Sequence, residues 1–273
     1  MPRIKSEEEL PDSRNILDTF PKDLVPSIGY KNIVIPLLIP SAGKGTRTIA
    51  KVSVSCDISQ DMKGSLINDH RKQLEGYKGE ETLIPEFVNN LLENFENQYG
   101  VQNGKVLVEY TILKKKISPV SKIESWVESQ ASFVGKLIKG NKKFYTSITG
   151  YYTSLCPRSK EISDYGAHSQ LSSANIIIEH DLEENIHNVL LDVIDKAGSS
   201  EIYNVISDLD ESYITEQMYE NPVFVEDVAR KLAVDLISTL GNIVKDYSIE
   251  VNHYESIHTS IATANINAGK ELK

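Results

Sequence analysis

The stretch PEFVNNLLENFENQYG (85–100), together with the residues after it up to 155, decides the fold. Its apolar residues recur at i, i+3, i+4 and i+7 from Val88, with Pro85 in the first turn and Gly100 at the end, which predicts a helix. Three strand-like stretches follow: KVLVEYTILK (105–114), SFVGKLIK (132–139) and KFYTSITGYYTSL (143–155). Gly140-Asn141 predicts a hairpin turn between the last two, so the pattern indicates antiparallel strands.

Upstream of the helix, NIVIPLLIP (32–40) and TRTIAKVSVSCDI (46–58) are β-rich, and Gly43-Lys44-Gly45 predicts a hairpin turn between them. The alternation around Cys56 predicts a small buried residue and no reactive thiol. Residues 1–27 are polar and acidic without a sustained period, which predicts a leader with no fold of its own.

The second half repeats this plan. SANIIIEH (173–180) predicts a strand, and Asp181 with Glu184 predicts the capped start of a helix that runs up to Gly198. Asn221 predicts the cap of a second helix, with Pro222 in its first turn and Gly241 at its end, before a final strand in YSIEVNHYESI (247–257).

A short internal sequence repeat indicates two modules. PEFV (85–88) and PVFV (222–225) each begin a helix that ends at glycine, about half the chain apart. We therefore predict an α+β fold of two similar modules, residues 28–140 and 141–273, each with antiparallel strands and helices gathered on one face.

Composition limits the class of protein. The 273 residues are 40% hydrophobic and 25% charged, as in ordinary globular domains, and no apolar run approaches the roughly 18 residues of a membrane span. Two cysteines cannot form a disulfide framework and no signal peptide is evident, so a cytoplasmic protein without a membrane partner is predicted. A net charge of −10 disfavours nucleic acid, and Lys114-Lys115-Lys116 is interpreted as a solvated strand end.

The segment LCPRSKEISDYGAHSQ (155–170) carries the chemistry. A cysteine at a strand end, Cys156, and a histidine twelve residues later, His168, can share one zinc ion, although a packing cysteine and a surface histidine explain the same spacing. A carboxylate would complete a three-ligand site, and four acidic residues crowd one region: Glu211, Glu216, Glu220 and Glu226.

This segment resembles the LCPxSKEIS…GAHNQR segment of the type IB GTP cyclohydrolases, zinc enzymes that open the imidazole ring of GTP for folate and pterin synthesis. Three further segments resemble that family in the same order: SPV (118–120), DESYITEQMYENPVFVEDVAR (210–230) and ESIH (255–258). The chain is identified as a divergent member of the family.

The resemblance implies a fold and an assembly. Two tandem tunnelling-fold modules of ββααββ order are expected to close into β-barrels within a homotetramer whose active sites lie at subunit interfaces. It also implies zinc, or another divalent metal such as Mn²⁺ or Fe²⁺, on the positions of Cys156, His168 and Glu211.

The resemblance further implies roles around a guanine nucleotide. Glu255 is expected to anchor the purine, and His258 and Glu226 are expected to transfer or position protons. Arg158 stands where the family has a small residue or cysteine, and it is expected to approach a phosphate. The implied reaction is hydrolysis at C8 of GTP with release of formate, which gives 7,8-dihydroneopterin triphosphate.

The chain lacks several basic or imidazole residues of the family. The replaced positions are Leu66–Asp69, Leu171, Ser207-Asp208 and Ser260. Because cations supply much of the affinity for polyphosphates, two alternatives stay open. One is a related zinc hydrolase that acts on a different or less phosphorylated purine nucleotide, and the other is a non-catalytic tunnelling-fold binding protein.

Overall fold

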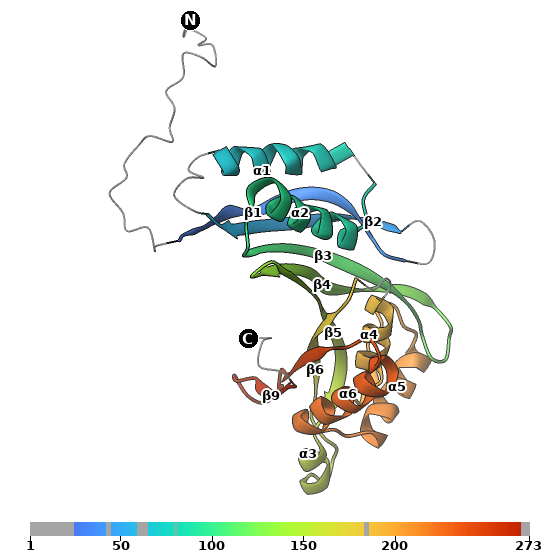
Figure 1. Ribbon diagram of the computed structural model, residues 1–273. Coiled ribbons are helices and arrows are strands. Elements are labelled where there is room, and N and C mark those ends of the chain that lie inside the picture. Colours follow the sequence, from blue (N-terminus) through green and yellow to red (C-terminus); the bar gives the residue numbers. More distant parts are fainter. Residues whose placement is uncertain (1–24, 42–44, 59–64, 80, 183–185, 269–273) are drawn as a thin grey trace, which may run out of the picture.

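The computed structural model describes residues 25–41, 45–58, 65–79, 81–182 and 186–268 (Figure 1). Within these residues the strands form one antiparallel sheet in the order β1-β2-β3-β4-β5-β6-β8-β9, with the short β7 paired to β5. The strands are β1 (Ser27–Ile39), β2 (Thr46–Asp57), β3 (Gly104–Ile117), β4 (Glu124–Ile138), β5 (Asn141–Leu155), β6 (Ser169–His180), β7 (Ser200–Glu201), β8 (Asp246–His253) and β9 (Ala262–Asn267).

The helices lie between the strands in a repeated order. They are α1 (Ser65–Gly76), the 3-10 turn η4 (Tyr77–Gly79), α2 (Ile84–Tyr99), α3 (Pro157–Ile162), α4 (Ile186–Asp195), α5 (Asp208–Glu220) and α6 (Val225–Leu240). The order β1-β2-α1-α2-β3-β4 recurs as β5-β6-α4-α6-β8-β9, with α3, β7 and α5 inserted in the second half. The predicted α+β fold with two ββααββ sets is confirmed.

Helix α2 follows from its sequence. Pro85 lies in the first turn, and Gly100 ends the helix in the left-handed conformation at φ 62°, where its N–H bonds to the carbonyls of the last turn. The apolar face of α2 is buried against β3 and β4. Gly135 of β4 makes this close packing possible, because a Cβ there would lie 2.4 Å from Val88.

One face of the sheet carries helices from both halves. Residues of β3 alternate, and Val106 and Val108 are buried in the core that includes α2. Further along the same face, the Tyr110 hydroxyl lies 2.6 Å from Nε2 of His187 on α4. A single hydrophobic core therefore runs through the described residues of both halves.

The basic run was interpreted wrongly as a solvated strand end. Lys116 is only 4% exposed, and its Nζ lies 2.6 Å from Glu201 Oε2 and also pairs with Asp195. Lys114 bonds to Asp195 at 2.7 Å from the same side of β3. Since β3 points every second side chain toward the helices, these two lysines lie inside a pocket of carboxylates. Only Lys115 extends outward, to Glu124.

Several predicted boundaries shift, including the end of the last strand, which is His253 and not Ile257. Ile138 pairs with Asn141, so the β4–β5 turn consists of Lys139 and Gly140, both at positive φ (49° and 78°), one residue before the prediction. Asn221 caps the end of α5, not the start of α6. The connection after Asn221 stays extended because the Val223 N–H bonds to the Leu155 carbonyl at 3.1 Å.

The hydrophobic patterns of the sequence missed several elements, although the ββααββ order implied by the family resemblance includes two of them, α1 and β9. The missed elements are α1, α3, β7, α5 and β9, while Ser27 already belongs to β1 and not to the leader. Glu184, of the predicted capping box, lies outside the described residues. Cys56 is fully buried as predicted, and burial, with a smaller effect from Asp57, raises its pKa to about 11. In the described part of the chain, no helix combines the length and apolar character needed to traverse a bilayer.

Candidate functional site

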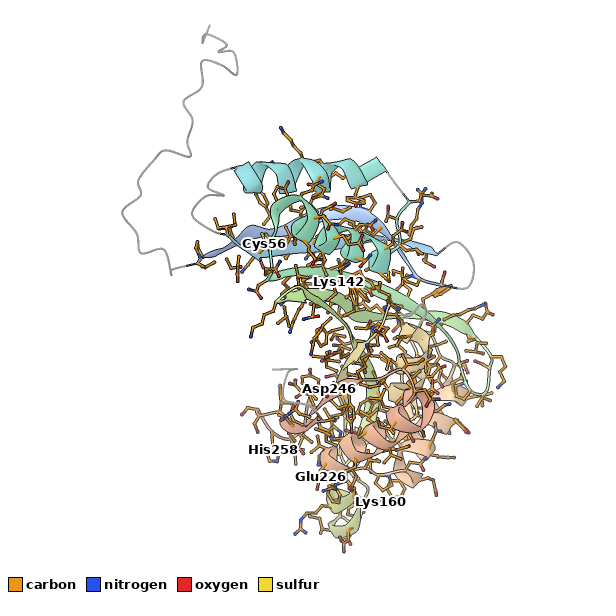
Figure 2. The ribbon with its side chains drawn as sticks, viewed as in Figure 1. Cys56, Lys142, Lys160, Glu226, Asp246 and His258 are labelled. Atoms are coloured by element: carbon orange, nitrogen blue, oxygen red, sulfur yellow. The ribbon has the colours of Figure 1, made fainter. Side chains whose placement is uncertain are left out.

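A small cavity of about 210 Å³ lies where β5 ends, α6 begins and the chain leaves β8. Three of the predicted site residues, Cys156, Glu226 and Glu255, line it together. The other lining residues are Pro157, Gln170, Val223, Phe224, Val225, His253 and Ala262. Figure 2 labels Glu226 and His258 at this end of the molecule. An apolar cavity of about 150 Å³ accommodates benzene, so this one has room for a purine ring.

Cys156 and His168 are held side by side by their backbones. The Cys156 N–H donates to the His168 carbonyl at 3.1 Å. Ser159 closes the loop between them, because its Oγ accepts from the His168 N–H at 3.2 Å and donates to the Cys156 carbonyl at 3.1 Å. The loop therefore brings the backbones of the two predicted metal-binding residues together.

A chain of polar side chains fixes the His168 ring. Nδ1 lies 2.9 Å from Gln170 Oε1, and Gln170 Nε2 donates to Ser154 Oγ at 2.8 Å, which lies 2.7 Å from Ser172 Oγ. Because Gln170 presents its carbonyl oxygen, Nδ1 carries the proton and the lone pair of Nε2 remains for a ligand. Metal-binding histidines are typically supported in this way.

Glu255 and His258 form a second pair. The His258 N–H donates to the Glu255 carbonyl at 3.2 Å, and His258 Nε2 lies 3.7 Å from Glu255 Oε2. The Glu255 side chain is 27% exposed and reaches the cavity, whereas the His258 side chain is 56% exposed. His258 therefore lies next to the predicted purine anchor, with its side chain largely in solvent.

Two predicted residues are not gathered here. Glu211 is exposed on the first turn of α5, and Arg158 is exposed on α3. In the residues that the structure describes, no three His, Cys, Asp or Glu side chains are grouped to hold a metal ion. The donor types of Cys156 and His168 suit zinc, but one chain alone does not bring Glu211 to them.

Asp210, next to Glu211, fastens α5 to the turn between β3 and β4. Its carboxylate accepts from the backbone N–H groups of Val120 (2.8 Å), Ser121 (3.0 Å) and Ser207 (2.9 Å), and from both serine hydroxyls. Burial alone would raise the pKa of Asp210, but these hydrogen bonds outweigh it and hold the pKa well below its usual range. Asp210 is the only buried residue of α5.

We expect Asp210→Asn to lower the thermal unfolding midpoint clearly, because an amide N–H₂ would face groups that are themselves donors. Asp208→Asn is the matched control, since Asp208 is an exposed acidic residue in the same helical turn. Differential scanning fluorimetry of both variants checks this. Equal midpoints for the two variants would contradict the anchoring role.

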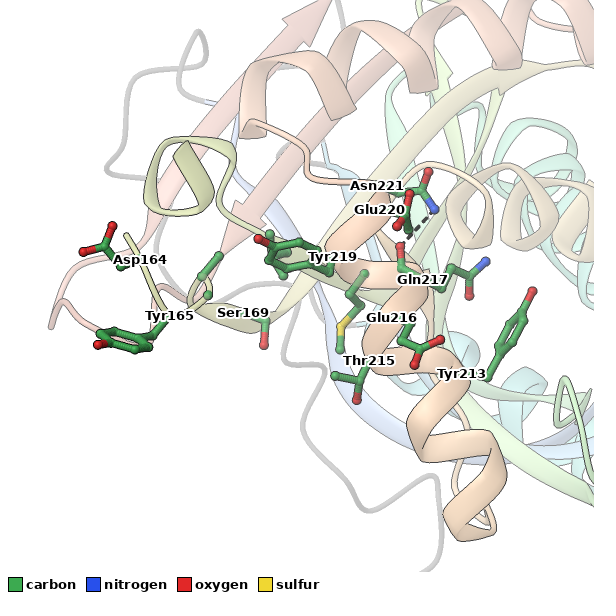
Figure 3. Close-up of a pocket in the computed structure, with 14 residues that line it drawn as sticks. Asp164, Tyr165, Ser169, Tyr213, Thr215, Glu216, Gln217, Tyr219, Glu220 and Asn221 are labelled. Carbon is green, nitrogen blue, oxygen red and sulfur yellow. Dashed lines mark hydrogen bonds between the residues drawn. The ribbon is translucent and has the colours of Figure 1, made fainter. Parts of the chain in front are cut away.

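A larger groove of about 930 Å³ lies between α5 and the loop around residues 164–167 (Figure 3). Lys160 lies beside it, with Nζ 4.1 Å from the centre of the Tyr219 ring and bonded to the Tyr219 carbonyl. In the described part of the chain, its lining residues include Asp164, Glu216 and Glu220 and no Lys or Arg. None of Cys156, Glu226 and Glu255 lines this groove, whereas all three line the smaller cavity, so the smaller cavity is the better candidate site.

Comparison with known proteins decides the family. Residues 10–264 match the family described as type I GTP cyclohydrolase folE2. A GTP cyclohydrolase FolE2 of Pseudothermotoga lettingae is 32% identical over 98% of this chain and 100% of its own length. Those of Geobacter sp. strain M21 (95% of this chain, 93% of the relative) and Neisseria gonorrhoeae (88% and 91%) are each 31% identical.

The chain belongs to the type I GTP cyclohydrolase folE2 family. Among solved structures, uricase from Arthrobacter globiformis superposes with a TM-score of 0.56 over 91% of this chain and 95% of the uricase, at 10% identity. This likeness concerns the fold alone, and it confirms the predicted tunnelling fold.

The folE2 family assignment makes it important where the family's basic residues are replaced in this chain. Leu171 and Ser260 are exposed, and Ser207 serves as the N-cap of α5. The side chains of residues 66–69 lie outside the described part. Among the described residues, the wall of the small cavity contains no Lys or Arg. Within one chain, the cations that a triphosphate needs are therefore missing from the described site.

The sequence patterns missed two residues of this candidate site, Gln170 and His253. Gln170 orients His168, and the only sequence signal for this role is that Gln170 lies two residues after His168. His253 lines the cavity from β8, and its alternating strand gave no sign of a functional role.

Proposed function

We propose that the protein is a zinc-dependent GTP cyclohydrolase that opens the guanine imidazole ring at C8, releases formate and yields 7,8-dihydroneopterin triphosphate. The observation that carries this proposal is the cavity that gathers Cys156, Glu226 and Glu255, with His168 fixed beside Cys156. Incubating the metal-loaded protein with GTP and measuring formate tests it. A protein that binds GTP and releases no formate would contradict it.

The metal would be held by Cys156 Sγ, His168 Nε2 and a carboxylate of Glu211. Zinc bound by three protein ligands lowers the pKa of its remaining water to about 7 and so supplies hydroxide at neutral pH. The exposure of Glu211 on α5 leaves it available to a site that is completed when subunits assemble.

The protein residues would orient the base and move protons. The Glu255 carboxylate accepts from N1–H and the 2-amino group of guanine together, which selects guanine over adenine. His258, whose Nε2 lies 3.7 Å from Glu255 Oε2, delivers a proton to the departing ring nitrogen. Glu226 also lines the cavity and positions the attacking water.

Assembly as a homotetramer with β-barrels is also proposed. β1 and β9 end the sheet in the described chain, and exposed edge strands leave backbone donors and acceptors that a second copy can pair. Large apolar side chains, including Ile49, Leu113 and Trp126, are exposed. Light scattering tests the oligomeric state.

The two free cysteines support a cytoplasmic location.

We expect Glu255→Gln to weaken guanine-nucleotide binding at least tenfold, because a mismatched buried hydrogen bond costs about 1–3 kcal/mol. Metal content should not change, since Glu255 is not a proposed ligand. Calorimetric titration with GTP and elemental analysis measure the two effects. Unchanged affinity would exclude Glu255 as the anchor.

A second candidate, a zinc hydrolase of less phosphorylated purine nucleotides, is favoured by the absence of Lys and Arg from the described cavity wall. It predicts that GTP, GDP and GMP differ in kcat/KM by less than about tenfold. The net charge of −10 adds repulsion toward the longer phosphate tails.

Arg158→Ala separates the two candidates. If Arg158 binds phosphate, its loss depresses turnover of GTP selectively and flattens the dependence on ionic strength. A preference for GTP over GMP beyond about a hundredfold, unaffected by Arg158→Ala, would contradict the second candidate.

A further inference from the structure

His253 has a place in the site that the proposed chemistry does not yet use. It ends β8, is 3% exposed, and forms part of the cavity wall together with Cys156 and Glu255. Glu255 follows it by two residues, so a ligand that contacts Glu255 also lies next to this imidazole.

Tyr152 fixes the proton of the His253 ring. The Tyr152 hydroxyl lies 3.2 Å from His253 Nε2, and the two rings meet edge to face with centroids 6.0 Å apart. Tyr152 is fully buried, and Nε2 is the only acceptor for its hydroxyl among the described residues. A buried O–H seeks an acceptor, so Tyr152 donates to Nε2 and the proton of the neutral ring lies on Nδ1.

The ring is neutral, with Nδ1 as its donor. Burial lowers the pKa of His253 to about 4, and the opposing effect of Glu226 is smaller. Nδ1 makes no hydrogen bond with any residue that the structure describes. It is also not one of the fully buried polar atoms that lack a partner, so it stays accessible from the cavity. Nδ1–H is therefore the group left to meet a ligand in the cavity.

We propose that His253 is a specificity-determining residue whose Nδ1–H donates a hydrogen bond to the 6-oxo group of the purine. This inference rests on the proposed function, in which Glu255 binds the N1–H and 2-amino groups. Those groups and O6 lie side by side on one edge of guanine, as donor, donor and acceptor. Glu255 and His253 together supply the complementary acceptor and donor.

The pairing excludes 6-aminopurines. Adenine would direct its 6-amino donor at Nδ1–H, which leaves two buried donors facing one another. A site built to bond a substrate group discriminates strongly against an analogue that cannot make the bond. The ligand class predicted for this site is therefore a 6-oxo-2-aminopurine nucleotide.

The test compares equilibrium binding of GTP with that of 6-thio-GTP, in which a weak acceptor replaces O6 while N1–H and the 2-amino group remain. The wild-type protein should prefer GTP by about tenfold, the value of one good hydrogen bond, and His253→Phe should reduce that preference to about twofold. His253→Gln keeps an N–H donor and should restore part of the preference. Inosine triphosphate, which lacks only the 2-amino group, reports on Glu255, and its discrimination should not change in either variant.

His187→Phe is the matched control. His187 is also buried and also bonds through Nε2 to a tyrosine hydroxyl, that of Tyr110, but it lies outside the cavity. It should keep the wild-type preference for GTP over 6-thio-GTP. An unchanged preference in His253→Phe, with GTP still bound, would overturn the role of His253 alone. No binding of GTP by the wild-type protein would overturn the proposed function and this inference together.

Discussion

Replacing Cys156 with alanine is expected to leave the purified protein with almost no bound zinc. Thiolate is the strongest donor of the proposed set, and His168 and an exposed Glu211 would remain as the only protein ligands. Elemental analysis after dialysis measures the zinc directly, and formate release from GTP should fall with it.

Cys56→Ala is the control for this experiment. Cys56 is a fully buried thiol whose pKa burial raises to about 11, so it is neither accessible nor ionised near neutral pH. Its variant should keep one zinc per chain, although the protein is less tightly packed. Stoichiometric zinc in Cys156→Ala would exclude Cys156 as a ligand.

Lys116→Met is expected to lower the free energy of unfolding by about 3 kcal/mol, as breaking a buried ion pair does. Lys116 bridges Asp195 of α4 and Glu201 of β7, and Asp195 is itself only 10% exposed. Without the ammonium group a buried carboxylate loses one of its partners. Lys114 still pairs with Asp195, so we place the effect at the lower end of the usual range.

Lys115→Met provides the comparison. Lys115 is the neighbouring lysine, and its pair with Glu124 lies in solvent, with both side chains about half exposed. Exposed pairs of this kind contribute about 0–1 kcal/mol. Urea denaturation of both variants measures the difference, and equal losses of stability would mean that the internal cluster contributes no more than a surface pair.

The sequence pattern predicted α2 and missed α5 for one physical reason. α2 buries a continuous apolar face, which leaves a helical period and the Pro85 and Gly100 signals. α5 buries only Asp210, whose hydrogen-bond partners Val120 and Ser121 lie about ninety residues earlier. A helix held by distant polar contacts has no apolar period for a pattern to detect.

The same distinction explains the site. Cys156 and His168 were predictable because one short loop joins them and Ser159 closes it locally. His253 was not predictable, because its role depends on Tyr152, which lies 101 residues away in the sequence. Glu211 is a third case. Its side chain is exposed, so no contact within the same chain shows which group it would bind.

The two-residue β4–β5 turn has a consequence for how the molecule unfolds. Since Ile138 and Asn141 pair directly, the backbone ladder passes from one half to the other without a linker, and β3 lysines bond to α4 on the far side. If one half opened while the other stayed folded, a sheet edge would be exposed and internal ion pairs would break. We therefore expect the two halves to unfold in one cooperative transition, so that loss of order around either set of helices reaches the candidate site.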